Sequence, residues 1–113
     1  MVFSLDSTDR QFRRFCRSGD PAALGAVFDA TAAELLRVAC HLAGNRADAE
    51  DLVQRTFLAA IESRAAYEPR RRALPWLIGI LANHARRLRR ERRVPPAGAA
   101  LASPDPSASA ADR

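Results

Sequence analysis

Residues 45–60, NRADAEDLVQRTFLAA, contain the pattern that decides the fold. Asn45 can cap a helix by accepting an orphan backbone N–H, and the acidic residues that follow lie where the helix dipole favours negative charge. Because successive helical residues turn by about 100°, the small and apolar side chains gather on one arc. The predicted buried arc consists of Ala49, Leu52, Val53, Thr56, Phe57 and Ala60. We therefore predict an amphipathic helix from Asn45 to about Ala65.

A longer helix is predicted before this one. Asp20 and Pro21 form a strong start signal, since the carboxylate can cap the helix and proline suits its first position. The helix runs to about Ala43, and Gly44 ends it. Its apolar residues recur at spacings of three and four, which predicts one buried stripe. The predicted stripe consists of Leu24, Phe28, Thr31, Leu35, Val38, Ala39 and Leu42.

Two further helices flank this pair. A short one is expected over about 9–17, ended by Gly19, and another begins at about Leu74-Pro75. The segment 66–73 between the third and fourth helices is predicted to be a loop, because Pro69 disfavours helix. The predicted buried residues are Phe12, Phe15 and Cys16 in the first helix, and Leu77, Leu81, His84, Ala85 and Leu88 in the fourth.

The composition favours helix over strand, since 48% of the residues are apolar but only 6% are aromatic, and alanine and leucine outnumber valine and isoleucine. A chain of 113 residues has room for one small domain. We predict an all-α fold, a small bundle of three or four helices, over residues 1–94. The Pro-, Ala- and Ser-rich stretch 95–113 cannot bury a core, so we expect a flexible linker or disordered tail.

Positive charge is concentrated in one part of the chain. All 18 basic residues are arginine, against 13 acids. Residues 1–63 contain seven arginines and nine acids, whereas residues 64–93 contain ten arginines and two glutamates. A concentrated positive field of this kind suits a polyanion, either nucleic acid or an anionic membrane surface.

Other classes of protein fit the sequence poorly. Cys16 and Cys40 have no close-spaced partner and no secretory leader precedes them, which favours structural cysteines in a reduced, cytoplasmic protein. No apolar run is long enough to span a membrane. No catalytic triad, paired carboxylates, phosphate-binding glycine loop or metal-ligand cluster is visible, so we expect no enzyme activity, metal or cofactor. His84 is interpreted as a packing residue.

The decapeptide AEDLVQRTFL at 49–58, followed by Pro75-Trp76-Leu77, Ile80, Asn83 and a run of arginines, resembles region 2 of a family of transcription factors. The family is the extracytoplasmic-function group of sigma-seventy RNA polymerase sigma factors, and the resemblance covers about 12–93. It implies a domain that binds core RNA polymerase and that recognises and melts the minus-ten promoter element to initiate transcription. Members normally continue into a helix-turn-helix domain, and the tail here looks like the linker that would lead to it.

The resemblance implies that the outer arc of the third helix binds polymerase. The polymerase-binding residues predicted on this arc are Asp48, Asp51, Gln54, Arg55 and Leu58. An apolar side chain ringed by polar groups is typical of the centre of a protein interface. The family usually has Glu where this chain has Arg55. That difference leaves three interpretations: an altered polymerase contact, compensation by Asp51 one turn earlier, or loss of polymerase binding.

The resemblance also implies that the loop from 67 to 73 captures an unstacked base of the single-stranded non-template strand, and that the fourth helix holds adjacent nucleotides. The predicted DNA-binding residues are Tyr67, Arg70, Arg71, Arg72, Trp76, Gly79, Asn83, Arg86, Arg87 and Arg90. Tyr67 or Trp76 can stack on a base, Asn83 can pair with a base edge, and the arginines can hold phosphates. For Trp76 an anchoring role at the core boundary is an equal alternative.

Two rival interpretations stay open at the level of sequence. The same surfaces can belong to a regulatory module that binds an anti-sigma protein or polymerase without opening a promoter. They can also belong to a generic basic helical protein attracted to any nucleic acid or to an anionic membrane. The second rival predicts equal affinity for duplex and single strand.

Overall fold

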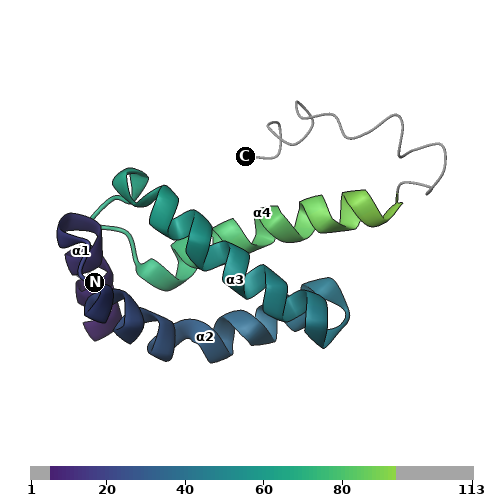
Figure 1. The fold of residues 1–113 in the computed structure, drawn as a ribbon, viewed down its shortest axis with the longest axis horizontal. Coiled ribbons are helices and arrows are strands. Elements are labelled where there is room, and N and C mark those ends of the chain that lie inside the picture. The colour runs from purple at the N-terminus through teal and green to yellow at the C-terminus, as the bar shows by residue number, and fades with distance from the viewer. Residues whose placement is uncertain (1–5, 94–113) are drawn as a thin grey trace, which may run out of the picture.

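The computed structural model describes residues 6–93, in which four α-helices follow one another (Figure 1). They are α1 (Ser7–Ser18), α2 (Pro21–Ala43), α3 (Arg46–Glu62) and α4 (Ala73–Arg93), with a short 3-10 turn, η1 (Arg64–Ala66), after α3. No strand occurs between residues 6 and 93, so the predicted all-α bundle is confirmed. The predicted boundary at residue 94 and the tail over 95–113 lie outside the described residues.

The ends of the helices are set by local capping groups. The side chain of Asn45 accepts the Asp48 N–H at 2.9 Å, and Asp20 caps α2 in the same way, both as predicted. Gly19 and Gly44 end α1 and α2 in the left-handed conformation, with φ of 74° and 87°. The first helix begins two residues earlier than expected, at Ser7, because Asp6 and Asp9 cap each other's backbone N–H groups.

The core lies between α2, α3 and α4, each of which packs against the other two. All six residues of the predicted buried arc of α3 are buried, as are Leu77, Leu81 and Ala85 of α4. His84 and Leu88 are only half-buried at the edge of this core. Thr56, fully buried in α3, donates its hydroxyl to the Leu52 carbonyl at 2.8 Å, so no polar atom of its side chain is left unpaired.

The predicted stripe of α2 was wrong in part. The helix buries a row spaced by four residues, and the larger side chains flank this row. The buried row consists of Ala23, Val27, Thr31, Leu35 and Ala39. Thr31, Leu35 and Ala39 were predicted, whereas at the start of the helix Ala23 and Val27 are buried in place of their neighbours Leu24 and Phe28. Phe28 consequently lies at the rim, 43% exposed, with its ring 5.0 Å from that of Phe57.

The first helix, α1, lies at one end of the bundle (Figure 1). An aromatic cluster joins it there to the other helices. Phe12 is fully buried at its centre. Its ring centroid lies 4.7 Å from that of Tyr67 and 5.5 Å from that of Trp76. The short first helix therefore packs directly against the segment that leads into α4, which is where the sequence placed a nucleic-acid-binding loop.

Candidate protein and nucleic-acid interfaces

The outer face of α3 presents the side chains that the sequence predicted. Leu58 is 60% exposed, and Phe28 on α2 is the other exposed large hydrophobic residue within the described part of the chain. Asp51, Gln54 and Arg55 are exposed on the same face. An apolar side chain surrounded by a carboxylate, an amide and a guanidinium can dock into a pocket of a partner while the polar groups form the rim.

Arg55 is paired with a carboxylate on its own helix. Its Nε lies 2.7 Å from Asp51 Oδ2, and both side chains are more than half exposed. An exposed pair of this type stabilises the helix by less than about 1 kcal/mol, so a partner can separate it cheaply. The pairing is the arrangement expected if Asp51 compensates the charge that Arg55 brings to this face.

Asp48 is held by internal contacts. Its carboxylate accepts a hydrogen bond from Asn45 Nδ2 at 2.8 Å and lies 2.9 Å from Arg92 Nη2. The Asn45 amide, and then the Arg92 guanidinium, hold the pKa of Asp48 below its ordinary value. With its side chain only 21% exposed, Asp48 ties the end of α4 to the start of α3 and is less accessible to a partner than the sequence predicted.

His84 and Arg87 lie on the edge of α4 that faces α3. Burial lowers the pKa of His84, and the guanidinium groups of Arg87 and Arg55 lower it further, while Asp51 acts in the opposite direction. Arg87 is half-buried, and its Nε is buried without a hydrogen-bond partner. Arg87 comes three residues after His84 and therefore lies on the side of α4 that faces α3. Its position does not support the predicted role in DNA binding.

The depressed pKa of His84 predicts a pH-dependent stability. Because the folded pKa lies below the ordinary value of 6.5, the unfolded chain binds the proton more readily. The free energy of unfolding should therefore fall as the pH is lowered from about 8 to about 5. His84→Gln should flatten this part of the profile of melting temperature against pH.

The matched control for this experiment is His41→Gln, because His41 is exposed on α2. This variant should keep the pH profile of the unmodified chain. An unchanged slope in His84→Gln would contradict the assignment of the pH dependence to His84.

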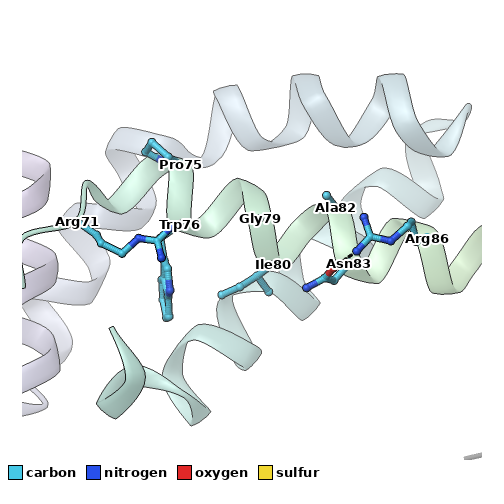
Figure 2. Close-up of a pocket in the computed structure, with 8 residues that line it drawn as sticks. All are labelled: Arg71, Pro75, Trp76, Gly79, Ile80, Ala82, Asn83 and Arg86. Carbon is cyan, nitrogen blue, oxygen red and sulfur yellow. Dashed lines mark hydrogen bonds between the residues drawn. The ribbon is translucent and has the colours of Figure 1, made fainter. Parts of the chain in front are cut away.

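A groove runs along α4 on the side away from the buried stripe (Figure 2). Its volume is about 440 Å³. The lining residues are Arg71, Pro75, Trp76, Gly79, Ile80, Ala82, Asn83 and Arg86. Five of them belong to the predicted DNA-binding set, whereas Pro75, Ile80 and Ala82 do not. The spacing could have revealed Ile80, since it lies four residues after Trp76 and therefore on the same face.

Trp76, Ile80 and Asn83 project from the same side of α4 into this groove (Figure 2). The Arg86 guanidinium donates a hydrogen bond to Asn83 Oδ1. This contact orients the amide and leaves its Nδ2 group to donate to a base edge. Trp76 is half-buried, so one part of its ring packs on Phe12 while another part lines the groove. Both roles that the sequence left open for Trp76 are therefore compatible with its position.

Tyr67 does not lie in the groove, and the expectation that it stacks on a base was wrong. It is only 5% exposed, with its ring against Phe12 and Trp76. Its hydroxyl donates to the backbone carbonyl of Arg71. Burial, reinforced by the nearby Asp9 carboxylate, raises the pKa of Tyr67 to about 12, so the hydroxyl stays protonated as a donor. The role of Tyr67 is to support the loop from inside.

The arginines of the loop and of the end of α4 divide into groups with different surroundings. Arg72 is turned back onto α1, with Nη2 3.3 Å from Asp6 Oδ2 and Nε 3.5 Å from Asp9 Oδ2. Arg71 lines the groove, and Arg70, the residue before it, is exposed. Arg90 is exposed further along α4, outside the groove. Among the predicted loop arginines, only Arg70 and Arg71 are therefore well placed to meet a phosphate.

Nowhere between residues 6 and 93 do three or more His, Cys, Asp or Glu side chains gather as a metal site would require. None of the helices in this range is long and apolar enough to cross a lipid bilayer.

These features define a helical recognition domain with one face suited to a protein and one groove suited to a polyanion. Residues 27–94 match the family model for Sigma-70 region 2, so the chain belongs to this family, as the decapeptide predicted. The RNA polymerase sigma factor CarQ of Myxococcus xanthus is 40% identical over 102 residues, which cover 80% of this chain. The chain spans 59% of the length of that relative. No solved structure matches the chain.

Proposed function

We propose that this domain serves in transcription initiation in the bacterial cytoplasm. In this proposal it binds core RNA polymerase through the outer face of α3 and captures the opened non-template strand of a minus-ten promoter element in the groove of α4. The family match supports the class of function. The groove carries the proposal, because a half-exposed indole, an oriented amide and flanking guanidinium groups converge there.

The groove offers the interactions that a single strand needs. An unstacked base loses stacking energy, and an aromatic ring such as Trp76 can return about 1–3 kcal/mol of it. Gly79 leaves open space beside the helix, since a Cβ built there would meet no atom within 4 Å. Arg71 and Arg86 lie at the two ends of the groove, where they can contact phosphates. Melting would then follow from trapping the open strand, and no nucleotide hydrolysis is needed.

Substitutions in the groove should separate base recognition from general attraction to DNA. Asn83→Ala and Trp76→Ala should each lower the preference for a minus-ten non-template oligonucleotide over a scrambled one, by about 1–3 kcal/mol. Arg90→Ala should weaken binding of both oligonucleotides alike and reduce the salt slope of the affinity by about 1. The measurement is fluorescence anisotropy with both oligonucleotides across a series of salt concentrations.

The outcomes of this titration distinguish the rival functions. If all three variants lose affinity equally for the minus-ten and the scrambled oligonucleotide, the result would count against base capture. If the unmodified domain binds polymerase but shows no preference between oligonucleotides, a regulatory module that binds polymerase or an anti-sigma protein is favoured. Equal affinity for duplex and single strand would favour a generic basic protein.

A further inference from the structure

A buried carboxylate links α1 to the start of α4. Asp9 is only 2% exposed. Its Oδ1 accepts the backbone N–H of Ala73 at 2.7 Å, across 64 residues of sequence. Its Oδ2 accepts the Asp6 N–H at 3.1 Å and lies 3.5 Å from Arg72 Nε. The two oxygens therefore act on different groups, one on the helix that bears the groove and one on the loop before it.

The contact with Ala73 replaces the cap that the local sequence lacks. The first N–H groups of a helix have no partner within the helix, and the residue before it usually supplies an acceptor. Here that residue is Arg72, whose side chain has only donors. Ala73 is fully buried, so water cannot take the place of Asp9. An unsatisfied buried donor costs about 1–3 kcal/mol, which makes the position of α4 depend on α1.

The same carboxylate controls which loop arginines face outward. Asp9 and Asp6 hold Arg72 against α1, while the Tyr67 hydroxyl holds the Arg71 carbonyl from inside. The loop is thus fixed from the interior at the Arg71 carbonyl and at the Arg72 side chain, while the Arg71 side chain lines the groove. Two residues after Ala73, Pro75 is the first residue of α4 that lines the groove.

We propose that Asp9 is a positioning residue for DNA recognition: without touching the strand, it sets the loop and the first turn of α4 in the arrangement that receives the base. This inference rests on the proposed function. It assigns α1 a part in recognition, although α1 contributes no residue to the groove.

Asp9→Asn tests the proposal, with Asp29→Asn as its matched control. Both substitutions remove one carboxylate from a helix, so they raise the general attraction to DNA equally, but Asp29 is exposed on α2. Asparagine is nearly isosteric with aspartate, and its neutral oxygen is a weaker acceptor that does not pair with Arg72. In Asp9→Asn the Ala73 amide should exchange its hydrogen several-fold faster, while amides in the middle of α2 keep their protection.

The second measurement is the ratio of affinities for the minus-ten and scrambled oligonucleotides. Asp9→Asn should lower this ratio about threefold or more, and Asp29→Asn should leave it unchanged. A folded Asp9→Asn variant with faster Ala73 exchange but an unchanged ratio would overturn the positioning role and leave the proposed function standing. An absence of preference in the unmodified domain would instead defeat the proposed function, and the positioning role with it.

Discussion

Replacing Leu58 by aspartate is expected to weaken binding to core RNA polymerase by about 2 kcal/mol or more, the loss typical of a residue at the centre of an interface. Leu58 is 60% exposed and contributes little to the core, so the melting temperature should change little. If Leu58 docks into an apolar pocket of the partner, as the proposed function implies, the aspartate must lose its hydration there, which costs more than simple truncation. Titration of labelled core polymerase with the variant domain measures the effect.

Ala33→Asp is the matched control for this prediction. Ala33 is exposed on α2, so the variant adds the same charge to a helix surface away from the outer face of α3. It should bind polymerase as the unmodified domain does. Undiminished binding by a folded Leu58→Asp variant would show that the exposed leucine is not part of the polymerase interface.

The exposure of Leu58 could be predicted from sequence because it depends on one helix alone. The helical period sorts the residues of α3 into two arcs, and every residue of the predicted buried arc is buried. The capping groups Asp20 and Asn45 were predictable for the same reason, since a cap acts within three residues of its helix.

The roles of Tyr67 and Arg72 could not be predicted in this way. Both are decided by α1, which lies more than fifty residues earlier in the sequence: Phe12 covers the Tyr67 ring, and Asp6 with Asp9 holds Arg72. A local pattern assigns a tyrosine and an arginine in a loop to the surface, but the packing of distant elements buries the tyrosine and turns the exposed arginine onto α1. The exposure of Phe28 has a similar origin, because the residues of α2 that face the core are chosen by its packing against α1, α3 and α4.

The arginines of residues 64–93 lie in two kinds of surroundings. Several of them stabilise the bundle: Arg92 pairs with Asp48, and the Arg64 guanidinium lies 5.5 Å from the centre of the Phe15 ring. Arg71 and Arg86 line the groove. The charge pattern predicts a polyanion as partner, but the number of arginines overstates how many of them line the groove.

Phe12→Ala should have the largest effect on stability, lowering the free energy of unfolding by about 3–5 kcal/mol. Phe12 is fully buried and touches Phe15, Tyr67 and Trp76, so its loss leaves a cavity at the centre of the aromatic cluster. Trp76, the one tryptophan of the chain, loses a ring that supports it, and its fluorescence should shift toward longer wavelengths. Urea denaturation followed by circular dichroism, together with the emission spectrum, measures both effects.

The matched control is Phe28→Ala, since Phe28 is 43% exposed at the rim of the core. Phe28→Ala should lower the free energy of unfolding clearly less, by about 1 kcal/mol. The tryptophan emission should stay unchanged, because Phe28 contacts Phe57 and not Trp76. Equal losses of unfolding free energy in the two variants would contradict the conclusion that Phe12 is the centre of the aromatic cluster. If Phe12→Ala also lowers the preference for the minus-ten oligonucleotide at a temperature where it is still folded, the groove depends on α1 through the aromatic cluster as well as through Asp9.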